Sequence, residues 1–281
     1  MNTNIIELTI LLLGISLIAG FFGSLTGLGG GVLVIPFLAL VLGVDIHYAA
    51  GAALVSVIAT SSGAASAYVK EGFTNVRLGM FLEIATASGA LVGASVAAHL
   101  PTAALAIIFG VILVFSSYLS SRSRGQQNVA DHPDPLATRL RMDSTYPTPE
   151  GPQPYHAHRV PLGFGLMFIA GSLSGLLGIG AGAFKVLAMD QAMRLPFKVS
   201  TTTSNFMIGV TAAVGAGVYL NNGYIDPGLA MPVVLGVLPG SLLGARVLIT
   251  ARSRVLRIIF GIVIFLLGIE MIYSGFTGRL H

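Results

Sequence analysis

The two halves of the chain repeat one pattern of glycine-interrupted apolar segments at an offset of 151 residues. GLGGG at 27–31 is matched by GIGAG at 178–182, and IIFG at 107–110 recurs at 258–261. No gap interrupts the correspondence, which indicates that one sequence has been used twice. The fold must therefore contain two similar units, each with a glycine break at the same place in an apolar segment.

The composition indicates that lipid, not water, surrounds most of this chain. Of its 281 residues 54% are hydrophobic and only 9% are charged, and the mean hydropathy is +0.85. Soluble domains carry about 25% charged residues. The 36 glycines suit a bundle whose helices approach closely. The net charge of +4 does not indicate nucleic-acid binding, because the basic residues lie in short loops between apolar segments. Cysteine is absent, which excludes disulfides and thiol chemistry.

Five apolar segments fit each copy, and four of the five approach the length needed to cross a bilayer, about 20 residues. The second segment of each copy spans only about 17 Å at 1.5 Å per residue. We therefore expect each glycine loop to lie at membrane depth and to feed a short half-helix. The predicted fold class is an all-α polytopic membrane protein with two repeats, 1–120 and 160–281. Its segments are 5–26, 32–43, 48–69, 77–99 and 101–120, then 161–177, 183–193, 199–220, 228–249 and 254–275.

The distribution of basic residues predicts that the second repeat is inverted relative to the first. Because each copy crosses the membrane an odd number of times, the second copy begins on the opposite side of the membrane and has the opposite orientation. If every segment changes sides, twelve basic residues fall on one side and only Arg279 on the other. The positive-inside rule makes that side the cytoplasm, so both termini are expected outside. No Lys or Arg precedes the first apolar stretch, so we expect it to be a retained helix and not a cleaved signal peptide. The twelve are Lys70, Arg77, Arg122, Arg124, Arg139, Arg141, Arg159, Arg194, Lys198, Arg252, Arg254 and Arg257.

Residues 121–159 differ in composition from both repeats. They contain six prolines, five arginines and few large apolar side chains. A segment of this kind buries too little apolar surface to order itself. We therefore expect a disordered cytoplasmic linker that joins the two repeats.

The two glycine loops are the first candidates for a binding site. Glycines remove side chains, so that a ligand can approach the backbone. The half-helices that follow would direct free N–H groups and positive dipole ends toward the loops, which favours an anion. Helix packing or a sharp turn is the alternative explanation. A nucleotide site is excluded, since GLGGGV lacks the last glycine of G-x-G-x-x-G and no P-loop lysine follows. The candidate residues are Gly27, Gly29, Gly30 and Gly31 in the first copy and Gly178, Gly180 and Gly182 in the second.

A lysine and a polar run in the second copy extend this candidate site. Lys185 follows the second loop by three positions, where a charge at membrane depth requires a partner or a function. Its alternative role is a structural pair with Asp190 or Glu83. Thr203, Ser204 and Asn205 could donate hydrogen bonds to an oxyanion. The first copy has Val34, Ala52, Ala53 and Leu54 at the matching positions, which makes the site asymmetric. Glu83, Asp190 and His99 could carry protons, and none is preferred.

At these residues the chain resembles the TauE/SafE family of sulfite exporter-like permeases. The similarity lies in GFFGSLTGLGGGVLVIP at 20–36, AAGAALV at 49–55, GIGAGAFKVLAMDQAMRLP at 178–196 and STTTSNFMIGVTAA at 200–213. The resemblance implies a bacterial inner-membrane protein that moves small anions, often sulfite or organosulfonates. Ala52-Ala53 and Ala181 depart from the Thr-Ser and the glycine frequent in the family, which affects the expected substrate and the ligands of the first half.

The predicted function is a secondary transporter that moves a small sulfur-containing anion by alternating access. The predicted partners are that anion and the bilayer, with no cofactor, no metal and no nucleic acid. The coupling ion and the oligomeric state, a homo-oligomer included, stay open. One alternative is a passive anion channel built from the same loops. The other is a membrane-embedded enzyme using Ser174 in GSLSG. His281 is the only histidine that follows Ser174 in the sequence, and the sequence contains no HExxH metal-binding motif.

Overall fold

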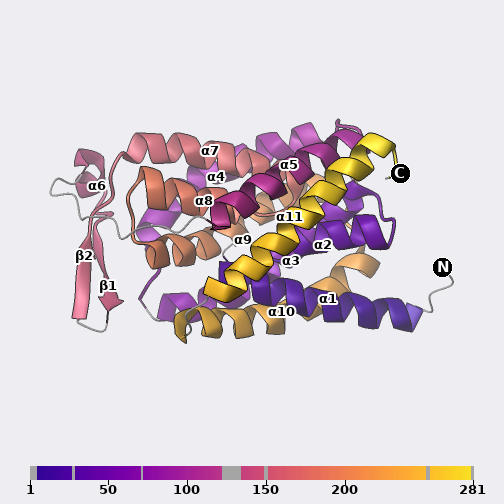
Figure 1. Cartoon of the computed structure of the whole chain (residues 1–281). Helices are drawn as coiled ribbons and strands as arrows, with labels where there is room; N and C mark the ends of the chain where they lie inside the picture. The colour runs from indigo at the N-terminus through magenta and orange to yellow at the C-terminus, as the bar shows by residue number, and fades with distance from the viewer. Residues whose placement is uncertain are drawn as a thin grey trace.

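The computed structural model describes residues 5–26, 29–70, 72–121, 134–148, 151–250 and 254–279. They form an elongated bundle of helices with a small β-hairpin at one end (Figure 1). Six helices are long and apolar enough to cross a membrane, which confirms the polytopic fold class. The six are α1 (Ile5–Thr26), α3 (Ile46–Lys70), α4 (Val76–Ala97), α7 (Val160–Leu177), α9 (Phe197–Asn221) and α10 (Pro227–Thr250). Two further long helices are α5 (Thr102–Ser121) and α11 (Arg254–Thr277).

The short second segment of each copy has the same form in both halves. In the first half α2 (Gly31–Pro36) runs into the π-helical turn η1 (Phe37–Val41), and in the second α8 (Gly182–Leu187) runs into η2 (Ala188–Ala192). These elements and the helices that follow them, α3 and α9, begin and end at positions related by the 151-residue offset. The predicted glycine break and short helix are therefore present in each half.

Helix contacts link the two halves symmetrically. Helix α4 packs on α7 and its repeat counterpart α10 packs on α1, while α3 packs on α9 and α5 on α11. Exchanging the two halves leaves this set of pairs unchanged, as a twofold relation would require. The inverted orientation in the membrane stays a prediction.

Glycines bring the backbones of the cross-half pairs into direct contact. A Cβ on Gly171 of α7 would lie 2.1 Å from the Thr86 carbonyl oxygen of α4, and one on Gly93 would lie 1.9 Å from the Ser172 carbonyl oxygen. In the equivalent pair, a Cβ on Gly240 of α10 would lie 2.1 Å from the Leu17 carbonyl oxygen of α1. Apolar surface gives helices no driving force to associate in lipid, so close van der Waals packing must hold them together, and small residues at such crossings permit it.

Part of the segment between the repeats is ordered, which corrects the expectation of disorder for residues 134–148 and 151–159. This part forms α6 (Pro135–Arg139) and a hairpin of β1 (Ser144–Thr148) and β2 (Gly151–Tyr155), with Ser144 opposite Tyr155. Apolar side chains from the bundle supply the core that the segment lacks, because Met142 and Tyr155 pack with Leu78 and Met193. Residues 122–133 and 149–150 lie outside the described residues.

Asn75 joins this hairpin to the membrane helices. Its Oδ1 caps α4 by accepting from Leu78 N (3.0 Å), and its Nδ2 donates to Met142 O (2.7 Å) and to Tyr155 Oη (2.9 Å). Burial raises the pKa of Tyr155 above its ordinary value, so its phenol is neutral at physiological pH. The hairpin is thus fixed to the start of α4.

Replacing Asn75 by alanine should lower the thermal stability of the detergent-solubilised protein. The change removes a helix cap and two buried hydrogen bonds, which together correspond to about 2–3 kcal/mol. Asn222→Ala is the control, since Asn222 is exposed and bonds only within its own helix, to Val218 O. Equal melting temperatures for the two variants would show that the hairpin adds no stability.

Candidate functional site

The two glycine loops, one from each half, lie against each other. A Cβ on Gly31 would lie 2.9 Å from Gly178 O, and one on Gly29 would lie 3.4 Å from Ile179 O. The structure therefore brings Gly29 and Gly31 against the second loop, while Gly30 faces Thr60 and Val237. Gly27 lies outside the described residues. Close contact between the loops requires the absence of side chains at these positions.

The loops meet at the middle of the bundle. The Val57 side chain of α3 would touch a Cβ on either Gly29 (3.3 Å) or Gly180 (3.0 Å). Ile208, the repeat counterpart of Val57, lies against Gly180 from α9. Val57 and Ile208 each lie near the midpoint of a 25-residue helix, which is about 37 Å long. A ligand at the loops would therefore lie about halfway across the hydrocarbon core.

Backbone conformation explains why glycine occupies the turns of both loops. Gly29, Gly178 and Gly180 have φ of 81°, 72° and 73°, values that residues with a Cβ rarely adopt. Ala181 departs from this pattern with φ 46° and so holds a left-handed conformation that costs about 1–2 kcal/mol for a residue other than glycine. Ala181 is thus a strained residue within the second loop.

Lys185 lies beside the second loop and is completely buried. Its side chain is 0% exposed, and Nζ donates to Thr211 Oγ1 (2.5 Å) of α9. Thr211 Oγ1 in turn donates to Glu83 Oε1 (2.6 Å) of α4 and lies 3.3 Å from Thr86 Oγ1. The ammonium and the carboxylate are therefore linked through one hydroxyl. We call Lys185, Thr211, Glu83 and Thr86 the charged cluster.

The three polar residues predicted from α9 separate in the structure. Ser204 Oγ donates to Gly182 O (3.3 Å), and Asn205 Nδ2 donates to Ser24 O (3.3 Å) at the end of α1. Both therefore adjoin the loops. Thr203 Oγ1 instead accepts from Asn75 N (3.1 Å) and faces the start of α4. Thr203 thus has a structural contact and does not meet the loops.

Sequence reasoning missed Thr60, Ser61 and Thr211. Thr60 lies against Gly30, and Ser61 Oγ donates to the Asn205 carbonyl oxygen (2.5 Å). Thr60 and Thr211 are related by the repeat offset, so a hydroxyl recurs at the same place in α3 and α9. That recurrence is a signal which could have identified both residues.

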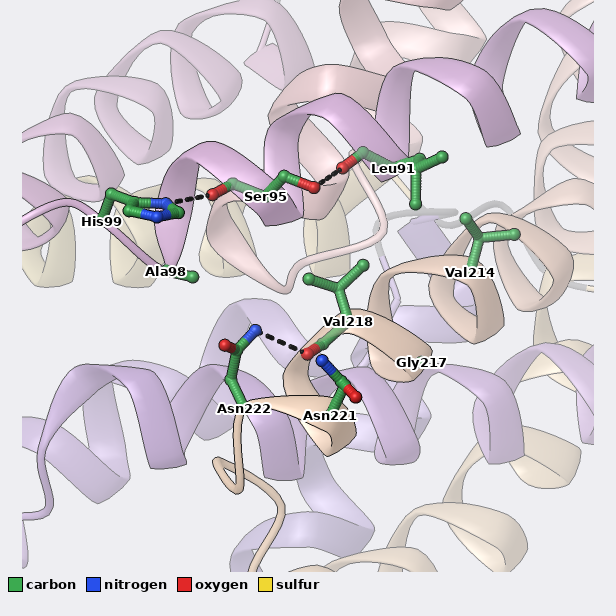
Figure 2. A pocket seen from close by; sticks show the side chains of 9 residues that line it. All are labelled: Leu91, Ser95, Ala98, His99, Val214, Gly217, Val218, Asn221 and Asn222. Carbon is green, nitrogen blue, oxygen red and sulfur yellow. Dashed lines mark hydrogen bonds between the residues drawn. The ribbon is translucent and has the colours of Figure 1, made fainter.

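A cavity of about 500 Å³ lies between α4 and α9, at the end of the bundle opposite the hairpin (Figures 1 and 2). Its polar lining comes from Ser95 on α4 and His99 just after that helix, and from Asn221 at the end of α9 and Asn222 just after it. The inner wall begins at Val214, one helical turn beyond Thr211. The cavity therefore lies on the side of α9 that leads toward the charged cluster.

Sequence comparison identifies the protein family to which this chain belongs. A family model described as "Sulfite exporter TauE/SafE" matches residues 12–271. The chain belongs to the TauE/SafE family. No solved structure matches it.

Named relatives of this TauE/SafE chain are described as membrane transporters. "Probable membrane transporter protein YunE" of Bacillus subtilis is 28% identical over 274 residues, covering 95% of this chain and 98% of the relative. A "Probable membrane transporter protein" of Xylella fastidiosa is 25% identical, over 97% of this chain and 98% of the relative. "Probable membrane transporter protein MJ0441" of Methanocaldococcus jannaschii is 24% identical, over 93% and 94%. The chain is thus a multi-pass membrane transporter and not an enzyme.

Gly180→Ala should slow transport at least tenfold, although it adds one methyl group. The new Cβ would lie 2.7 Å from Ile208 Cγ2 and 3.0 Å from Val57 Cγ1, so the loop or these two side chains must move. Gly223→Ala is the matched control, because Gly223 has a similar φ of 75° with nothing within 4 Å of a Cβ. Both variants carry the same backbone strain, so a difference between their transport rates comes from crowding at the second loop. Equal counterflow rates in proteoliposomes would remove the second loop from the transport site.

Proposed function

We propose that this TauE/SafE transporter is a secondary carrier of a small sulfur-containing oxyanion or organosulfonate in the bacterial inner membrane, working by alternating access. The observation that carries the proposal is a fully buried ammonium, that of Lys185, beside two side-chain-free loops at the middle of the bundle. A fixed positive charge at that depth selects anions and rejects cations.

Hydrogen bonding supports an oxyanion as the ligand. An ammonium has three N–H donors, and Thr211 accepts one of them. Ser204 and Asn205 add a hydroxyl and an amide next to Gly182 and the end of α1. Sulfur oxyanions and sulfonates present three or four acceptor oxygens, and the loops let them approach the backbone without meeting a side chain. The proposed binding residues are therefore Gly29, Gly30, Gly31, Gly178, Gly180, Gly182, Lys185, Ser204 and Asn205.

The pairing of helices across the halves supports a carrier. Alternating access requires two bodies that rock about a fixed central site, and repeat-built transporters place that site where their halves meet. The basic residues support a cytoplasmic hairpin and termini on the outside. A passive channel through the same loops is the alternative that the test must separate.

Counterflow in proteoliposomes tests both the mechanism and the substrate class. Vesicles loaded with unlabelled sulfite or methanesulfonate receive the same anion in labelled form, with taurine, sulfoacetate, sulfate and thiosulfate as competitors. A carrier transiently accumulates label in exchange for internal anion, and the effective competitor names the substrate class. A channel gives equilibration without accumulation. Absence of counterflow for every anion, from folded protein, would overturn the proposal.

A further inference from the structure

We propose that Glu83 couples anion transport to the proton gradient, so that one proton crosses with each monovalent anion. This inference rests on the proposed function, because it assigns the coupling ion to the same central site. Glu83 takes up a proton when the anion binds at Lys185 and releases it when the anion leaves on the other side.

The geometry of the charged cluster provides the link between the two events. Thr211 contacts both the Lys185 ammonium and Glu83 Oε1, so a change at one charged group is transmitted to the other through a single hydroxyl. Glu83 Oε2 is buried and has no hydrogen-bond partner among the residues that the structure describes. That oxygen is free to receive a proton, while Oε1 keeps its bond to Thr211.

Few other charges face Glu83 from the elements packed around it. Helix α7 contains no ionisable side chain. Helix α9 contributes Lys198 in its first turn and Tyr219 near its last, both far along the helix from Thr211. On α4 itself, Arg77 is exposed and lies six residues before Glu83. Buried Asp190 of η2 also takes part in an interaction. Lys185 is the charged group that Thr211 joins to Glu83.

Charge balance determines the stoichiometry. Without ligand, the positive Lys185 and the negative Glu83 compensate each other. A monovalent anion at Lys185 would leave one uncompensated negative charge in a low-dielectric region, which is strongly unfavourable. A proton taken from the adjoining water converts the Glu83 carboxylate to a carboxylic acid and restores neutrality. Anion and proton then move together without net charge transfer.

The cavity between α4 and α9 leads from one end of the bundle toward Glu83, as far as Leu91 and Val214. It extends from His99 and Asn222 at the end of the bundle to Val214, one turn from Thr211 (Figure 2). Polar side chains at its mouth can hold water. Glu83 lies two turns below Leu91, which also lines the cavity.

The test compares Glu83→Gln with Glu270→Gln, a matched control on α11 whose side chain is exposed. The probe is labelled methanesulfonate, which stays monovalent and takes up no proton in this pH range. With a lumen about one pH unit more alkaline than the outside, one proton per anion sustains about tenfold accumulation. We expect this accumulation from the wild type and from the Glu270→Gln variant, and its loss in Glu83→Gln, whose neutral amide resembles the protonated acid and still permits exchange.

A pH-sensitive dye inside wild-type vesicles supplies a measurement that does not depend on a variant folding. Anion entry should acidify the lumen by about one proton equivalent per anion beyond the change in protein-free vesicles. Counterflow without that acidification, or undiminished accumulation by Glu83→Gln, would overturn the coupling and leave the carrier standing. Absence of counterflow in the wild type would instead overturn the proposed function.

Discussion

Lys185→Met is expected to abolish saturable anion uptake, reducing it at least about a hundredfold. Removing one partner of a buried, hydrogen-bonded charge pair corresponds to about 3–5 kcal/mol, and more than 2.7 kcal/mol of lost ligand stabilisation gives that factor. Methionine retains most of the lysine's volume, so the fully buried site stays filled. The measurement is initial uptake of labelled sulfite or methanesulfonate at matched protein levels.

Lys198→Met provides the control for charge removal alone. Lys198 is exposed, and its ammonium lies 5.3 Å from the Phe73 ring centroid at the end of the bundle. Its loss should leave uptake near that of the wild type. The double variant Lys185→Met/Glu83→Gln removes both charges of the cluster together and should be folded yet inactive. Wild-type uptake by Lys185→Met would make Lys185 a structural residue.

Gly171→Ile is expected to prevent formation of the folded protein. The added Cβ alone would lie 2.1 Å from the Thr86 carbonyl oxygen, and 2.6 Å from its Cα, so the backbones of α4 and α7 must separate. Overpacking a well-packed site by small groups already costs about 1–3 kcal/mol, and here backbone atoms, not flexible side-chain ends, block the new group. Size-exclusion chromatography in detergent should show aggregate in place of a single peak.

Gly165→Ile tests whether this effect comes from the crossing or from isoleucine itself. Gly165 lies on the same helix, is exposed, and has nothing within 4 Å of a Cβ. The same substitution there should give a monodisperse protein with near wild-type thermal stability. A well-folded Gly171→Ile protein would mean that α4 and α7 do not make the close contact described.

The sequence predicts the apolar elements well because each is long and because the residues that begin and end it are adjacent to it in the sequence. The segment expected at 48–69 is α3 at 46–70, and the one expected at 77–99 is α4 at 76–97. Glycine breaks at 27–31 and 178–182 are equally local signals, and the short helices begin where they end. The ordered hairpin was missed because Leu78 and Met193, which complete its core, are distant in sequence.

The candidate site was predictable only in part. The chain alone identifies Lys185 as unusual and the glycine loops as related. Which helix faces meet is a property of packing, so the contact of Thr211 with both Lys185 and Glu83 could not be read from spacing. Thr203 illustrates the converse: it is adjacent to Ser204 in sequence, yet one residue along a helix turns a side chain by about 100°. It therefore bonds to Asn75 and not to the loops.

The pairing of α4 with α7 and of α1 with α10 has a consequence for biogenesis. Each pair takes one helix from either half, so α1 and α4 leave the translocon before the helices that cover their glycine faces have been synthesised. Until α7 and α10 enter the bilayer, lipid chains must occupy those faces. The first half therefore cannot complete its packing alone: α4 gains its partner only when α7 has been made, and α1 only when α10 has been made, close to the end of translation.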